Sequence, residues 1–299
     1  MTAPGLELDF AQRVAALCPG FVATAPPRAF RKSQILVGNV AGVPVLAKRL
    51  IKPDAVWAWY FARELALYRM FASAPPGVRT PRLIAAADDV LVIERIGGEP
   101  LAAKRRPGAT LPIRTIGALL AASDALARYT SPPMPKPVAR MHARLHERLL
   151  EIPGEPSWAQ DGLRLAARRG LLAEPIARTF DDALARYPAT AFGHGDLLLR
   201  NAICDDDDDL VLVDWECAGV HPRDWDRALL WTQLAPLARG FVEDAVRDSG
   251  GRWRAFLALV SFALVRELRF CDAFAPSDKS RAERAAIEAE LAAVAARLD

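Results

Sequence analysis

The sequence predicts an α+β protein with a small antiparallel-sheet lobe followed by a larger, mainly helical lobe. Two features lead to this fold class. Up to about residue 95 the chain alternates β-prone runs with a single helical segment, whereas most of the chain from residue 113 onward is rich in Ala, Leu and Arg at helical spacing. With 299 residues, the chain is long enough for two lobes with a substantial core. We expect an N-terminal lobe at 1–95 and a C-terminal lobe at 96–299, with a hinge at about 94–98.

The first lobe is predicted from strand and turn signals. The segments QILVGNV and VPVLAKRL, between Gln34 and Leu50, read as two strands that turn at Ala41-Gly42. Pro53 then ends the strand and Asp54 offers an N-cap for a helix that runs to about Phe71. A second strand pair is expected at Arg82–Ala86 and Val90–Arg95, before Gly97-Gly98.

The second lobe is predicted from helical periodicity. Four stretches are mostly helical: 113–129, 138–151, 158–185 and 225–296. Between the last two lies one compact β element, from Ala202 to Trp215. No internal repeat is found.

The charge of the chain excludes little by itself. A formal net charge of +3 is too small to indicate nucleic acid as a partner, and we expect none. Residues 1–95 carry 12 Lys and Arg against 7 Asp and Glu, whereas the remainder carries 27 against 29. A basic first third suits a polyphosphate ligand, and an ordinary solvated surface explains it equally well.

We expect a cytoplasmic protein without a membrane partner. Its four cysteines (Cys18, Cys204, Cys217 and Cys271) are widely separated, as is usual for reduced thiols. No signal peptide is evident at the N-terminus, and the longest apolar stretch, Phe256 to Val265, is too short to span a bilayer. The sequence does not indicate the oligomeric state.

The most informative stretch is FGHGDLLLRNAICDDDDDLVLVDWE, residues 192–216. Its two β-prone runs flank five aspartates, which predicts a hairpin with an exposed acidic turn. Folding this hairpin places Asn201 beside Asp214, and their oxygens suit Mg²⁺. Asp196, five residues before Asn201, lies in the loop that leads in and could complete a phosphoryl-transfer centre. An ordinary acidic hairpin is the alternative.

A lysine and a glutamate in the first lobe also require explanation. Glu64 interrupts an otherwise apolar helical stripe of Trp57, Phe61, Tyr68 and Phe71. Lys48 shares a strand face with Leu46 and Leu50. If Lys48 and Glu64 form an ion pair, neither charge is buried without a partner, which would be unfavourable. The pair would also aim the ammonium at phosphates. Two independent side chains that each reach water are the alternative.

Together these residues resemble the aminoglycoside phosphotransferase and choline kinase-like family, whose members have a protein-kinase-like fold. The resemblance rests on Lys48, Glu64 and the segments VLVIERIGGEPL, HGDLLLRN and LVDWE, followed by HPRDWDRA. These occur in the family order and span roughly residues 34–230.

The resemblance implies a role for each matching residue. Asp196 would be the catalytic base, and Asn201 and Asp214 would hold Mg²⁺. Lys48, fixed by Glu64, would contact the α- and β-phosphates of ATP, with GTP not excluded. The implied adenine contacts are the Glu94 carbonyl and the Ile96 amide. His194 would shape the loop, and Asp226 would support it.

Two departures from related sequences are evident. The loop that should cover the nucleotide, near Arg31-Lys32-Ser33, contains no glycine, so backbone amides or Ser33 would have to serve. Gly195 and Leu198 stand where protein kinases have Arg and usually Lys. The second departure favours a small-molecule kinase over a protein kinase.

The acceptor is expected to be a small molecule with a hydroxyl group. An aminoglycoside-like antibiotic, an amino alcohol, a sugar and a natural-product intermediate remain open, and antibiotic resistance is not specifically favoured. Candidate contacts to the acceptor are Glu216, Asp224, Glu267, Asp272 and Arg200. A catalytically silent nucleotide-binding protein of the same fold is the alternative function, followed by a protein kinase.

Overall fold

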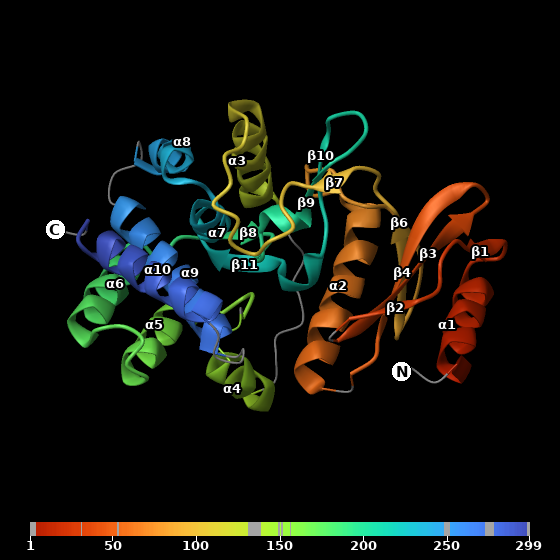
Figure 1. The fold of residues 1–299 in the computed structure, drawn as a ribbon, viewed down its shortest axis with the longest axis horizontal. Helices are drawn as coiled ribbons and strands as arrows, with labels where there is room; N and C mark the ends of the chain where they lie inside the picture. Colours follow the sequence, from red (N-terminus) through yellow and green to blue (C-terminus); the bar gives the residue numbers. More distant parts are fainter. Residues whose placement is uncertain are drawn as a thin grey trace. The chain divides into compact units, whose positions relative to one another are not determined.

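The fold of the chain is given by a computed structural model (Figure 1). The model describes residues 4–30, 32–52, 54–130, 139–148, 150, 152–155, 157–247, 252–272 and 278–297. The chain forms two compact units. The first unit contains residues 1–101 and 201–217, and the second contains residues 102–200 and 218–299. The predicted combination of an antiparallel-sheet N-terminal region and a mainly helical C-terminal part is confirmed.

The first unit is built on a six-stranded antiparallel sheet. Its strands are β1 (Phe21–Ala23), β2 (Arg28–Ala29), β3 (Ser33–Val40), β4 (Val43–Leu50), β5 (Leu83–Ala87) and β6 (Val90–Glu94). The strand order is β1-β3-β4-β6-β5, and β2 also pairs with β3. The turn between β3 and β4 lies at Ala41-Gly42, as predicted, with φ angles of 48° and 82° that match the twist of the hairpin.

Two helices contribute to this unit, one on each side of the sheet (Figure 1). The first, α1 (Pro4–Leu17), was not predicted, and its Phe10 and Val14 pack with Val45 and Ala47 of β4. The second, α2 (Ala55–Ser73), begins where predicted, because the Asp54 side chain accepts a hydrogen bond from the Val56 amide at 2.8 Å. Strand residues alternate in direction, so β4 presents Lys48 on the face opposite Val45 and Ala47.

The predicted hairpin belongs to a second, three-stranded sheet of the first unit. Strands β9 (Ala202–Cys204) and β10 (Leu210–Leu212) pair antiparallel, and β7 (Glu99–Pro100) joins β9. Residues 96–101 and the hairpin belong to the same compact unit as the six-stranded sheet. The prediction of a nucleotide-binding lobe at 1–95 and a catalytic lobe at 96–299 concerns function and stays a prediction.

The second unit is mainly helical. Its helices are α3 (Ile113–Arg128), α4 (Ala139–Glu147), α5 (Trp158–Arg168), α6 (Glu174–Arg186), α7 (Trp225–Gln233), α8 (Pro236–Arg247), α9 (Arg252–Asp272) and α10 (Asp278–Ala295). Helix α9 is largely buried and contacts α5, α6, α7, α8 and α10. A strand pair that was not predicted, β8 (Thr190–Gly193) and β11 (Gly219–Pro222), completes the unit.

Two predicted helical stretches are divided in the structure. The stretch 158–185 breaks after Arg169, since Gly170 adopts a φ of 69°, and Pro175 then opens α6. The stretch 225–296 forms four helices, and residues 248–251 and 273–277 lie outside the described part. Parts of the predicted helix 138–151 and of the segments around Arg31 and Pro53 also lie outside it. Among the described helices, none is both long and apolar enough to cross a membrane.

The backbone at Gly98 provides a test of the pairing between β7 and β9. A Cβ at this position would lie 2.1 Å from the Cys204 carbonyl oxygen, and the φ angle is 81°. We expect Gly98→Ala to lower the free energy of unfolding by about 3 kcal/mol or more, because steric conflict adds to left-handed strain. Gly108→Ala is the matched control: φ is 58° and a Cβ meets nothing within 4 Å, so only strain of about 1–2 kcal/mol applies. Equal losses in urea denaturation would contradict the expected conflict.

Candidate functional site

The Lys48–Glu64 ion pair predicted from the sequence is present in the first unit. The Lys48 Nζ donates to Glu64 Oε2 at 2.7 Å, and both residues are buried. Helix α2 buries most of the predicted stripe: Phe61, Tyr68 and Phe71 are each at most 5% exposed, and Trp57 is partly exposed. Each charge therefore has an oppositely charged partner, and neither is buried alone.

Lys48 also contacts the segment that follows the hairpin. Its Nζ lies 2.9 Å from Asp214 Oδ1 and 3.9 Å from Glu216 Oε2. Between the two acids, Trp215 in the 3-10 turn η2 (Trp215–Cys217) is fully buried, and its ring packs edge-on against Phe71 of α2 at 4.9 Å. Trp215 thus anchors the segment to α2, and the carboxylates of Asp214 and Glu216 stand on either side of it in the sequence.

The charges in this cluster shift one another's pKa values. Burial alone would lower the pKa of Lys48, but Asp214, Glu64 and Glu216 hold it well above its ordinary value. Burial raises the pKa of Glu64 to about 7; Lys48 opposes this rise, and Asp214 and Glu216 add to it. The ammonium therefore stays charged, and the surrounding carboxylates are crowded enough to attract a further cation.

Oxygen ligands for a metal gather at the same place. One carboxylate oxygen each of Glu64, Asp214 and Glu216 lie within 4.8 Å of one another. Asp214 adopts a φ of 64°, which is unusual for a residue other than glycine and common at functional sites. Asn201 is buried, and its backbone carbonyl accepts a hydrogen bond from the Val213 amide at 2.9 Å. The hairpin therefore pairs Asn201 with the residue that directly precedes Asp214. These hard oxygen donors fit Mg²⁺.

The five aspartates between β9 and β10 form a closed turn. The Asp205 carboxylate accepts from the amides of Asp207 and Asp209, at 3.0 and 2.9 Å, and pairs with Arg79. Asp206 to Asp209 are exposed, as predicted for a solvated turn. The turn therefore stabilises the hairpin that carries Asn201 and Asp214.

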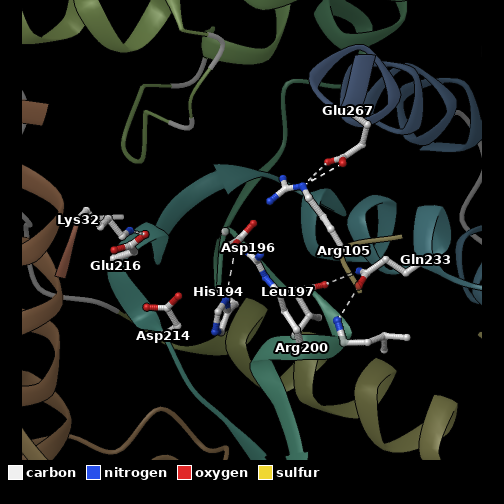
Figure 2. A network of polar contacts seen from close by, with 12 residues as sticks. Lys32, Arg105, His194, Asp196, Leu197, Arg200, Asp214, Glu216, Gln233 and Glu267 are labelled. Carbon is white, nitrogen blue, oxygen red and sulfur yellow. Dashed lines mark hydrogen bonds and ion pairs between the residues drawn. The ribbon is translucent and has the colours of Figure 1, made fainter. Parts of the chain in front are cut away.

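In the second unit, buried contacts fix the segment that carries Asp196. It follows β8, and the Asp226 carboxylate accepts from the amides of His194 at 2.7 Å and Gly195 at 2.9 Å. The Trp225 indole donates to the Gly195 carbonyl at 2.9 Å. His194 is fully buried and its Nδ1 accepts from the Asp196 amide at 3.4 Å (Figure 2). This geometry agrees with the expected structural roles of His194 and Asp226.

Gln233 fixes the residues after Asp196, and sequence reasoning missed it. Its Oε1 accepts from the Leu199 amide at 2.6 Å, and its Nε2 donates to the Leu197 carbonyl at 3.1 Å (Figure 2). Gln233 is the last residue of α7 and is fully buried. Its only signal in the sequence is an amide at the end of an apolar helix.

The residues predicted to contact the nucleotide, Ser33 in the covering loop and Glu94 and Ile96 at the adenine, lie in or just after strands of the first unit. Ser33 is buried and begins β3, so it belongs to the sheet rather than to an open loop. Glu94 ends β6, and its carboxylate accepts from the Arg82 amide at 3.2 Å and from the Arg82 guanidinium at 3.0 Å. Ile96 follows in the connection to β7 and is partly exposed.

The candidate contacts to the acceptor whose side chains are described each form an ion pair with an oppositely charged residue. Asp224 is buried between Arg227 and Arg252, and Glu267 accepts from Arg105 Nε at 2.8 and 2.9 Å. The other pairs are Glu216 with Lys32, in the first unit, and Arg200 with Asp196, at 3.5 Å in the second. The side chain of Asp272 lies outside the described part. Lys32 is a further residue that sequence reasoning did not assign.

Solved structures with a similar fold include macrolide and aminoglycoside phosphotransferases. Macrolide 2'-phosphotransferase MphH from Brachybacterium faecium is 15% identical, over 95% of this chain and 98% of that chain, with a TM-score of 0.58. The GDP complex of aminoglycoside 2'-phosphotransferase-IIIa is 15% identical, over 96% and 98%, with a TM-score of 0.61. A thermostable mutant of aminoglycoside phosphotransferase APH(4)-Ia, in a ternary complex with ADP and hygromycin B, is 12% identical, over 97% and 98%, with a TM-score of 0.57. At these identities the likeness establishes the fold.

Sequence comparison establishes the family. No curated protein sequence matches the chain. The model of the phosphotransferase enzyme family matches residues 49–260, more than two-thirds of the chain. The matched range contains Glu64, Asp196, Asn201 and Asp214, and Lys48 lies one residue before it. The chain belongs to the phosphotransferase enzyme family and is a small-molecule kinase.

Proposed function

We propose that the protein transfers the γ-phosphoryl group of ATP to a hydroxyl group of a small molecule, with Mg²⁺ as the metal. The observation that supports this most is the position of the Lys48 ammonium, which Glu64 and Asp214 hold at 2.7 and 2.9 Å. GTP remains open as a donor. Two of the structural neighbours are complexes with GDP and with ADP, which agrees with a nucleotide donor.

Lys48 would bind the α- and β-phosphates. A buried ammonium whose pKa is held high stays protonated at neutral pH and attracts phosphate oxygens strongly in a medium of low dielectric constant. Glu64 would keep the ammonium in place through the reaction, because the residue is only 2% exposed and water competes little for its carboxylate. The Glu94 carbonyl and the Ile96 amide are the proposed contacts to adenine, and Ser33 is the proposed contact from the loop that covers the nucleotide.

Asn201 and Asp214 would hold Mg²⁺, with Glu64 and Glu216 as neighbouring carboxylates. When bound, the metal supplies neutralisation of the charge that gathers on the phosphate oxygens. The protein's own contribution is the strained Asp214 backbone, which Trp215 fixes against α2.

Asp196 would orient the acceptor hydroxyl and accept its proton. Its side chain is 13% exposed, so its carboxylate interacts with few waters. The buried hydrogen bonds of Asp226 and Gln233 hold the backbone on either side of it. A base that is already positioned avoids the reorganisation that a mobile side chain would need at each turnover.

The charge pattern favours an acceptor with little positive charge. Residues 102–200 and 218–299 carry 27 Lys and Arg against 21 Asp and Glu, a surplus of six. Asp224 and Glu267, which could have bound a polycation, already pair with arginines. Neutral sugars, singly charged amino alcohols and similar natural-product intermediates therefore fit better than an aminoglycoside. A cytoplasmic location would supply the ATP that this reaction needs.

Turnover of ATP with a panel of acceptors tests the proposal. The panel contains neutral sugars, amino alcohols, macrolides and aminoglycosides, and phosphorylated product is measured by mass spectrometry. We expect Mg²⁺-dependent phosphorylation of at least one acceptor, loss of activity on chelation, and a fall in kcat of about 10²–10⁴ in Asp196→Asn. Asp182→Asn, at an exposed position of α6, is the control and retains activity.

Other outcomes separate the alternatives. If ATP binds without phosphorylation of any acceptor, and Asp196→Asn behaves as the wild type, the protein is a silent nucleotide-binding protein. Phosphate that enters polypeptides and no small molecule would indicate a protein kinase.

The hydrogen bonds of Asp226 give a second test, of how Asp196 is positioned. Asp226→Asn removes a charged acceptor from two buried amides, so we expect kcat to fall about tenfold or more while KM for ATP changes little. Gly193→Ala should act in the same direction, because its Cβ would lie 2.7 Å from Asp226 Oδ2. Asp244→Asn, at an exposed position of α8, is the matched control. Unchanged kcat in Asp226→Asn would show that these bonds do not position the base.

A further inference from the structure

Lys32 lies where the family resemblance implies a glycine-rich loop over the nucleotide. It lies in the short turn between β2 and β3, in which the Phe30 amide donates to the Ser33 carbonyl at 2.7 Å. The Lys32 carbonyl accepts from the Ile51 amide at 3.0 Å, just after β4. The Phe30 amide and the Lys32 carbonyl are therefore engaged with the sheet, and the Lys32 ammonium is a group that the described part of this turn can offer to a ligand.

The Lys32 side chain reaches the same carboxylates as Lys48. Its Nζ forms an ion pair with Glu216 Oε1, and the other oxygen of Glu216 lies 3.9 Å from Lys48 Nζ. One carboxylate thus bridges two ammonium groups. All of these residues belong to the first unit, so the arrangement is part of a single compact body.

Two features keep Lys32 charged and in place. Its Nζ lies 4.7 Å from the ring centroid of Trp57, where the face of the indole attracts a cation. Burial would lower the pKa of Lys32, but the carboxylates of Glu216 and Asp214 more than offset this, so the pKa is raised. The side chain is 24% exposed, which leaves it accessible to a ligand.

The balance of charge indicates what this arrangement can bind. Two ammonium groups face three carboxylates, those of Glu64, Asp214 and Glu216. A metal ion that binds the carboxylates would compete with the lysines for them and release positive charge toward an anion. A nucleoside polyphosphate with its metal supplies both partners at once.

We propose that Lys32 is a second phosphate-binding lysine of the nucleotide site, held by Glu216 until a nucleoside polyphosphate binds. On binding, the ammonium leaves Glu216 for phosphate oxygens and takes over the work that backbone amides do in a glycine-rich loop. This inference rests on the proposed nucleotide-dependent function. It assigns Lys32 a contact with phosphate and Glu216 the role of a competitor for Lys32.

The test compares ligands that differ in their phosphates. Affinities for ATP, ADP and adenosine are measured by calorimetry, with Mg²⁺ and separately with chelator, for the wild type, Lys32→Ala, Lys32→Arg and Glu216→Gln. We expect Lys32→Ala to weaken ATP and ADP about tenfold or more and to leave adenosine unchanged, with partial recovery in Lys32→Arg. Glu216→Gln should tighten ATP, because it removes the competing carboxylate. Lys52→Ala, which removes an exposed lysine just after β4, controls for net charge.

Three results would overturn the inference. In the first, Lys32→Ala weakens ATP and adenosine equally, which indicates a structural role. In the second, Lys32→Ala binds ATP as the wild type does, which removes Lys32 from the site while leaving the proposed function intact. In the third, the wild type binds neither ATP nor ADP, with or without Mg²⁺, and the proposed function fails together with the inference.

Discussion

The ammonium group of Lys48, enclosed by carboxylates, is the constraint on which the rest of the first unit depends. Lys48 lies on a central strand, pairs with Glu64 from helix α2, and pairs with Asp214 from the segment after the hairpin. A buried ammonium without partners would destabilise the fold by several kcal/mol. The sheet, α2 and the hairpin segment therefore have to come together around it, and Trp215 supplies the apolar contact that holds the last of these in register.

The second unit solves a different problem, which is to hold a loop still without regular secondary structure. Asp226 and Gln233 both belong to α7, and both form buried hydrogen bonds with backbone groups around Asp196. Such bonds are costly to leave unmade, so they restrict the loop to one conformation. Rigidity at Asp196 and charge at Lys48 are thus built by separate parts of the chain.

Much of this could be predicted from the sequence because the signals were local. The strands on either side of Ala41-Gly42, the N-cap at Asp54 and the hairpin around the aspartates each depend on a few adjacent residues. The Lys48–Glu64 pair was predictable for a different reason: each charge interrupts an apolar pattern, and each is the simplest explanation of the other.

What could not be predicted depends on contacts between distant residues. Helix α1 is an exception, because Phe10, Val14 and Leu17 stand at helical spacing and the signal is local. Strands β8 and β11 are four residues each and pair across 25 intervening residues, so no local pattern indicates them. The partner of Lys32 is 184 positions away, and Arg252 and Arg105, which pair with Asp224 and Glu267, lie 28 and 162 positions from them.

The coupling free energy between Lys48 and Glu64 tests the central claim most directly. It is obtained from the unfolding free energies of the wild type, Lys48→Met, Glu64→Gln and the double variant, without nucleotide. Because each single change leaves a charge in the cluster without its partner, the account predicts that the double variant is more stable than the sum of the single losses implies, by about 1–3 kcal/mol. Losses that add to within about 0.5 kcal/mol would contradict it.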